Sequence, residues 1–181
     1  MIATNKQFLR QSKNLNMRLS CPNNTLVLQG PIGSFLYPLN SPLVYLKKEK
    51  KLFLSQSLVK NKSISKLSHI MLIQASLGVL LGYRRQLNIV GIGYQASVEK
   101  TNEVSFLVLK LGFSHQVRIK VPDYLEVTCP KPRIIVLKGI NLQKVNNFAA
   151  VIRKLKLPSA YKEKGIYFSG ERVKLKQGKK T

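Results

Sequence analysis

The order of predicted elements occurs twice along this chain, and this repeat limits the possible fold more than any other feature. In the first half, four short β-prone runs precede a helix at 64–80; the runs span 25–28, 35–39, 43–46 and 52–54. In the second half, four more precede a helix at 142–156; these span 106–109, 116–121, 125–129 and 134–137. Strands followed by a helix, twice, predict an α+β fold of two duplicated small domains, each a mostly antiparallel sheet covered by one helix. A single domain that repeats by coincidence is the alternative.

Both helices show an apolar face. Ser63 is the predicted N-cap of the first helix. Its predicted core face consists of Ile64, Leu67, Ile70, Met71 and Leu77. The second helix has the apolar set Val145, Phe148, Ala149, Ile152 and Leu155.

The repeat and the charge distribution together predict four segments. They are a basic N-terminal arm (1–20), a first α+β domain (21–82), a second α+β domain (83–160) and a basic C-terminal tail (161–181). The arm has four basic residues and no acid, which fits either direct contact with a polyanion or an organelle transit peptide.

The tail is the most basic segment of a strongly basic chain. Residues 161–181 hold seven Lys and Arg against two Glu, and the whole chain holds 31 against 7, a formal charge of +24. A segment with this charge offers too little apolar surface to pack into a core, so we expect it to become ordered on a polyanion. The charge excess is typical of a nucleic-acid-binding protein.

Other classes of protein find little support. The longest apolar run, Ile70–Leu81, is 12 residues long, whereas a membrane-spanning helix needs about 20; we therefore expect no membrane partner. Cys21 and Cys129 are far apart and no His/Cys cluster exists, so we expect two reduced thiols and no metal site.

The run Gly91-Ile92-Gly93-Tyr94-Gln95-Ala96 has the spacing of a dinucleotide-binding loop. That loop must open a helix and be followed by an acid about 20 residues on. Here 97–103 (SVEKTNE) is predicted to be a polar turn before a strand. We therefore expect no cofactor and no small-molecule substrate. The scattered acids and the isolated His69 and His115 predict no catalytic residues either, so the chain is not expected to be an enzyme.

Four motifs follow one another in the second half: GIGYQA at 91–96, LKLGFSH at 109–115, GINLQKV at 139–145 and PSAYKEKGIY at 158–167. In this order they resemble the large-subunit ribosomal protein six family, and FAAVIR at 148–153 fits as well. The resemblance covers Leu81 to Lys180. In the first half it rests on the turn Gly30-Pro31-Ile32-Gly33.

The resemblance implies two duplicated α+β domains that bind large-subunit rRNA, mainly through the C-terminal domain and tail. It places such a protein beside the sarcin–ricin loop and the stalk base, among neighbouring ribosomal proteins and near docking translation factors, with no cofactor and no catalysis. The residues that it assigns to rRNA contact are Lys162, Lys164, Gly165, Tyr167, Arg172, Lys174 and Lys176. To these we add the basic residues Lys154, Lys179 and Lys180.

The predicted roles differ by residue type. Lys and Arg neutralise phosphates, and Gly165 would allow the backbone to come close to RNA. Tyr161 or Tyr167 would stack on a base or ribose. The alternatives are a free-standing RNA-binding protein outside the ribosome and a nucleotide-dependent enzyme built on Gly91 and Gly93.

Composition bears on the compartment. The chain has few acids, and its ending, residues 173–180, resembles mitochondrial members of the family. We therefore expect a protein of the mitochondrial ribosome, in the matrix, with a plastid or the bacterial cytoplasm as alternatives.

Overall fold

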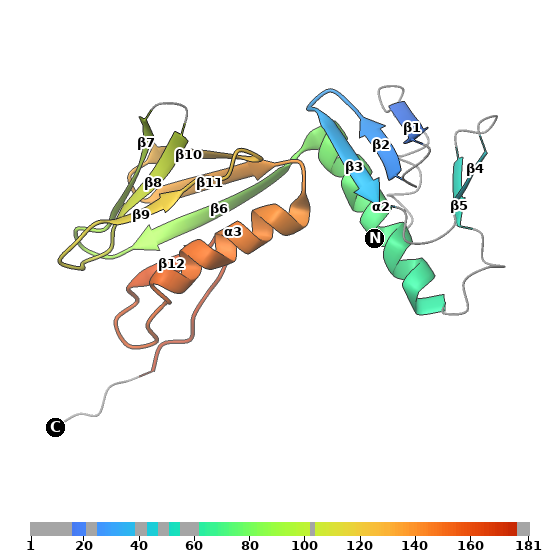
Figure 1. Cartoon of the computed structure of the whole chain (residues 1–181). Coiled ribbons are helices and arrows are strands. Elements are labelled where there is room, and N and C mark those ends of the chain that lie inside the picture. Colours follow the sequence, from blue (N-terminus) through green and yellow to red (C-terminus); the bar gives the residue numbers. More distant parts are fainter. Residues whose placement is uncertain are drawn as a thin grey trace. The chain divides into compact units, whose positions relative to one another are not determined.

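The computed structural model describes residues 16–20, 25–38, 43–46, 51–54, 62–101 and 104–176. The chain divides into two units, Met1–Gly82 and Tyr83–Thr181 (Figure 1). In the described part of each unit, antiparallel strands accompany one helix, so the predicted α+β class is confirmed. No helix in the described stretches is both long and apolar enough to span a membrane.

The first unit contains a three-stranded antiparallel sheet, a separate hairpin and a helix. The sheet has the order β1-β2-β3 and consists of β1 (Asn16–Ser20), β2 (Thr25–Gln29) and β3 (Ser34–Pro38). The hairpin pairs β4 (Leu43–Leu46) with β5 (Lys51–Leu54), and the helix is α2 (Lys62–Leu81). Strand β1 lies within the segment 1–20 that was predicted to be an arm, so residues 16–20 of that segment belong to the sheet.

Helix α2 packs against β2 and β3 with a different face from the predicted one. Its buried residues include Leu72, Ser76 and Val79, whereas Leu67 and Ile70 are about half exposed. From Ile70 to Leu81 the helix is apolar on most sides, so the sequence periodicity does not select one face. The helix also begins before Ser63, which therefore lies within its first turn and is not the cap.

The second unit combines two antiparallel sheets with helix α3 (Leu142–Leu155). The four-stranded sheet has the order β10-β11-β6-β12, with strands Leu125–Lys131, Ile134–Gly139, Tyr83–Val90 and Gly165–Phe168. The three-stranded sheet has the order β7-β8-β9, with strands Gln95–Thr101, Val104–Lys110 and Val117–Lys120. The predicted polar turn at 97–103 is wrong for Ser97–Thr101, which lie in β7 and pair with β8. Residues 102–103 are outside the described part.

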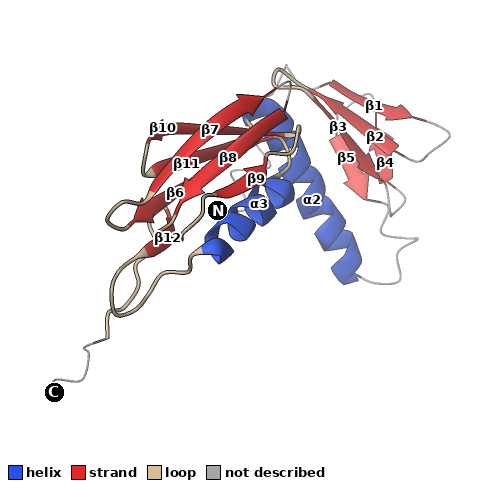
Figure 2. Cartoon of the chain, turned by 60° about the vertical axis from the view of Figure 1, so that its left-hand side comes forward, coloured by secondary structure: helices blue, strands red, loops and turns tan. Residues whose placement is uncertain are grey.

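Helix α3 lies along one face of the four-stranded sheet (Figure 2). Its predicted apolar face is confirmed, since Val145, Phe148, Ala149 and Ile152 are buried, and Leu155 packs against the same core. Asn141 caps the helix, because its Oδ1 accepts hydrogen bonds from Gln143 N at 2.9 Å and Lys144 N at 3.3 Å. The core of this unit draws side chains from both sheets and from α3.

Candidate nucleic-acid interface

The segment after α3 is folded, contrary to the expectation that it could not pack into a core. Strand β12 pairs antiparallel with β6, and Ile166 is fully buried opposite Ile89. A further hydrogen bond joins Ile166 N to Lys156 O at 2.9 Å. The mean charge of the segment concealed a short alternation in which Ile166 and Phe168 face the core and Tyr167 between them faces outward. Through β12, the described part of the predicted tail belongs to the second unit.

Gly165 has a structural reason to be glycine. It is buried, its φ is 150°, and a Cβ there would lie 2.6 Å from Pro158 Cα. The nearest atoms are backbone atoms, which a small rotamer change cannot move aside. Close packing on Pro158 thus accounts for this residue, and we leave Gly165 out of the proposed RNA surface.

A tight turn between α3 and β12 carries the first two predicted lysines. Ser159 Oγ accepts hydrogen bonds from Tyr161 N at 3.3 Å and Lys162 N at 3.4 Å. Ser159 N in turn donates to Lys164 O at 3.0 Å. With its backbone fixed in this way, the turn displays Lys162 and Lys164 in solvent, next to Tyr161, which is 65% exposed.

Tyr167 is held on the outer face of β12. It is opposite Asn88 of β6, and its hydroxyl donates to Glu163 O at 2.8 Å. Burial, and to a smaller extent the carboxylates of Glu163 and Glu171, raise the pKa of the phenol. The side chain lines an open groove of about 380 Å³, whose wall also includes Arg172, the acids Glu163 and Glu171, and the apolar Val90, Val173 and Leu175. An aromatic ring beside a guanidinium in an open groove suits an unstacked base.

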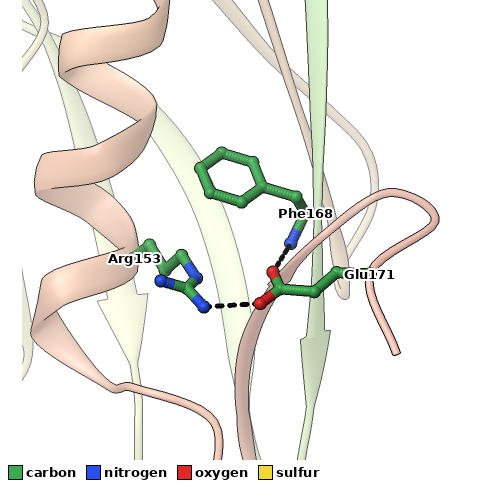
Figure 3. A network of polar contacts seen from close by, with 3 residues as sticks. All are labelled: Arg153, Phe168 and Glu171. Atoms are coloured by element: carbon green, nitrogen blue, oxygen red, sulfur yellow. Dashed lines mark hydrogen bonds and ion pairs between the residues drawn. The ribbon is translucent and has the colours of Figure 1, made fainter. Parts of the chain in front are cut away.

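An ion pair holds the end of the described chain against α3 (Figure 3). Glu171 accepts from Arg153 Nη2 through Oε1 at 2.5 Å and from Phe168 N through Oε2 at 3.1 Å. The Arg153 guanidinium also lies 5.5 Å from the centre of the Phe168 ring. The sequence patterns did not predict this contact. The signal that could have found it is Glu171 itself, an acid within a basic tail.

The chain turns at Gly170 and then runs back beside the Ser159 turn. Gly170 has φ 86° in a turn closed by Glu171 N donating to Phe168 O at 3.0 Å, and Lys176 N donates to Ala160 O at 3.0 Å. Six of the predicted cations are therefore exposed on a folded support: Lys154, Lys162, Lys164, Arg172, Lys174 and Lys176. In the described part of the chain none of these six has an ion-pair partner. We call them the tail surface; Lys179 and Lys180 lie outside the described residues.

The glycine-rich run does not form a nucleotide-binding loop. Gly91 and Gly93 lie in a turn that joins β6 to β7, so a strand follows where the dinucleotide motif needs a helix. Over the described ranges, no three His, Cys, Asp or Glu side chains come together in a way that could hold a metal ion. Cys129 is a free thiol whose pKa is raised by burial, while Cys21 lies outside the described residues.

The chain is similar to known proteins over most of its length. The family described as Ribosomal protein L6 matches residues 90–169. The large ribosomal subunit protein uL6m of Reclinomonas americana is 38% identical over 178 residues, which is 93% of this chain and 93% of that protein. The large ribosomal subunit protein uL6 of Sinorhizobium fredii is 37% identical over 164 residues, 89% of this chain and 90% of that protein. The uL6m protein of Neurospora crassa is 44% identical over 109 residues, 57% of this chain and 43% of that protein.

Proposed function

This chain belongs to the ribosomal protein L6 family, and from that premise we propose that it binds large-subunit rRNA through the tail surface of its second unit. Membership makes it a structural component of the large ribosomal subunit and not an enzyme. The observation that carries the proposal is the set of six exposed cations on a folded support, none of which has an ion-pair partner among the residues that the structure describes. Cations held in place before binding neutralise phosphates with little further loss of conformational freedom.

The proposed roles follow from where the side chains lie. Lys154, Lys162, Lys164, Lys174 and Lys176 contact phosphates, and Arg172 contacts a phosphate or a base beside the Tyr167 groove. Tyr161 offers an exposed ring for stacking, and Tyr167 offers its ring as one wall of the groove. Lys179 and Lys180 extend the same basic sequence.

We place the bound protein beside the sarcin–ricin loop and the stalk base, with other large-subunit proteins as neighbours and translation factors docking nearby. This location rests on the family resemblance of the second half of the chain. We propose that the protein is part of the mitochondrial ribosome, in the matrix. The support for that compartment is the similarity to the uL6m proteins of Reclinomonas americana and Neurospora crassa, together with the low acid content.

Sedimentation of the tagged full chain from an organelle-enriched lysate tests the proposal. We expect the wild-type chain to move with the large subunit on a sucrose gradient in moderate and in high salt. The double variant K162Q/K164Q should leave the subunit at lower salt, because two phosphate contacts are lost. The matched control R84Q/K100Q removes the same charge from two other exposed positions. A wild-type chain that stays at the top of the gradient would instead identify a free-standing RNA-binding protein.

A further inference from the structure

Two turns lie at the same end of the four-stranded sheet as the tail surface. The proposed function assigns no role to either of them. One turn joins β6 to β7 at 91–94, and the other is the tip between β10 and β11 at 131–134. The register fixes their position, because Asn88 of β6 pairs with Ile134 on one side and Tyr167 on the other. Val90, the last residue of β6, pairs with Gly165, which directly follows Lys164. The 91–94 turn is therefore next to the lysine-bearing start of β12, and the 131–134 tip lies on the other side of β6 at the same end of the sheet.

Backbone hydrogen bonds tie the two turns into one rigid feature. Ile89 N donates to Arg133 O at 2.8 Å, and Ala96 N donates to Pro132 O at 2.7 Å. Ile89 lies in β6 just before the 91–94 turn, and Ala96 lies in β7 just after it. The 131–134 tip is therefore bonded to a strand of each sheet. We call the pair of turns, 91–94 and 131–134, the two-turn platform.

The packing of Tyr94 explains the glycine at position 91, whereas Gly93 is favoured by its φ of 76°. A Cβ on Gly91 would lie 2.5 Å from the Tyr94 ring, and one on Gly112 would lie 2.9 Å from the same ring. Tyr94 is thus buried between two glycines and anchors the turn. With Tyr94 turned inward, Ile92 is left 86% exposed, the highest value among the large apolar side chains that the structure describes.

The platform is basic and hollowed. Lys131 and Arg133 are exposed on either side of Pro132, and within the described ranges neither has an ion-pair partner. A hollow of about 430 Å³ lies between the turns, and its wall is made by Gly93, Tyr94, Gln95 and residues 131–134, with no acid. Such a positively charged surface is complementary to a polyanion and repels a positively charged partner.

We propose that the two-turn platform is a further rRNA-contacting site, continuous with the tail surface. Lys131 and Arg133 bind phosphates of one RNA segment, and Ile92 packs against the face of an unstacked base or its sugar. An apolar side chain at a rigid tip, flanked by cations, is the arrangement by which nucleic-acid-binding proteins insert a wedge beside a base. This inference rests on the proposed function, because both surfaces would bind the same rRNA.

Binding of the full chain to transcribed large-subunit rRNA over a range of salt concentrations tests the inference. The variant K131Q/R133Q should lose about tenfold in affinity at moderate salt, and the slope of log K against log salt should fall by roughly two. The control R84Q/K100Q again removes one Arg and one Lys, from the ends of β6 and β7 that are far from the turn joining them. It should change affinity and slope much less.

The variant Ile92→Ser tests the apolar contact alone, because it removes the apolar side chain without changing the charge. We expect about a three- to tenfold loss of affinity with an unchanged salt slope, since no phosphate contact is lost. The melting temperature should stay the same, because the side chain makes few contacts in the free protein. An affinity equal to that of the wild-type chain would remove Ile92 from the site.

The tail variant K162Q/K164Q tells the two proposals apart. If it weakens rRNA binding while K131Q/R133Q behaves like the control, the tail surface stands and the platform inference is wrong. If neither variant differs from the control, the proposed function is wrong as well. If K131Q/R133Q binds rRNA normally but fails to enter the large subunit, the platform contacts an acidic protein neighbour and our assignment to RNA is overturned.

Discussion

At the scale of single residues, Gly165 and Tyr167 show how the tail surface is built. Gly165 combines a φ of 150° with three backbone atoms within 2.8 Å of the position that a Cβ would take. The first property strains any L side chain, and the second leaves no space for one. Tyr167, two positions later, has its hydroxyl bound to the carbonyl of Glu163. Both residues thus fix the turn that carries Lys162 and Lys164.

We expect Gly165→Ala to lower the free energy of unfolding by about 3 kcal/mol, since strain and overpacking add. Gly170→Ala is the matched control: Gly170 has φ 86°, but nothing lies within 4 Å of its Cβ position. That change should cost only about 1 kcal/mol, from strain alone. Urea unfolding of the three chains measures both values. Equal losses for the two variants would show that contact with Pro158 has no energetic effect.

The raised pKa of Tyr167 makes a second prediction at this scale. Its pKa lies above the usual 10.0 because burial, Glu163 and Glu171 disfavour the phenolate. A raised folded-state pKa stabilises the protein below the unfolded-state pKa, and this stabilisation is lost as the pH rises through the folded-state value. Stability should therefore fall above about pH 10 more steeply in the wild-type chain than in Tyr167→Phe. Urea midpoints from neutral pH upward test this, and parallel curves would contradict it.

At the scale of elements, β12 converts a basic tail into part of a sheet. Ile166 is fully buried beside Ile89, while Leu175, only nine positions on, is 54% exposed. We expect Ile166→Ala to cost about 2–4 kcal/mol of unfolding free energy in the free protein. The control Leu175→Ala should stay within about 0.5 kcal/mol of the wild-type value. If Ile166→Ala is neutral without RNA and destabilising only with it, the strand forms on binding.

The Arg153–Glu171 pair should stabilise the same element. Both side chains are about three-quarters buried, and the pair also satisfies Phe168 N. A double-mutant cycle with Arg153→Met and Glu171→Gln should give a coupling energy of about 1 kcal/mol, between the values for exposed and for buried charged hydrogen bonds. Hydrogen exchange should be faster at Phe168 N in each single variant. Strictly additive effects on stability would mean that the two side chains do not interact in solution.

Sequence patterns predicted the elements with a clear period and missed those without one. Helix α3 has apolar residues spaced for one face, and that face is the buried one. Helix α2 is apolar on most sides from Ile70 onward, so the sequence could not tell that Leu72 and Val79 are the buried residues. Strand β7 carries the exposed polar residues Ser97, Glu99 and Lys100, which made it resemble a turn. Strand β12 has only Ile166 and Phe168 to mark it, and partners from β6 supply the rest.

At the scale of the whole molecule, charge is distributed over both units. Residues 83–181 hold 20 Lys and Arg against 6 acids, and residues 1–82 hold 11 against 1. Net charge alone would therefore have both units contribute to RNA binding in a similar way. The tail surface differs from a general basic surface because its cations lie on one folded support.

This difference predicts how much each unit contributes to rRNA binding. The fragment 83–181 contains a complete core drawn from both of its sheets and α3, so it should fold alone and unfold in one transition. It should bind transcribed large-subunit rRNA with a salt slope within about one unit of the full chain's slope, because the phosphate contacts that we propose all lie on this unit. Parallel titrations of fragment and full chain measure the slopes. A slope lower by several units in the fragment would show that residues 1–82 carry a comparable share of the phosphate contacts.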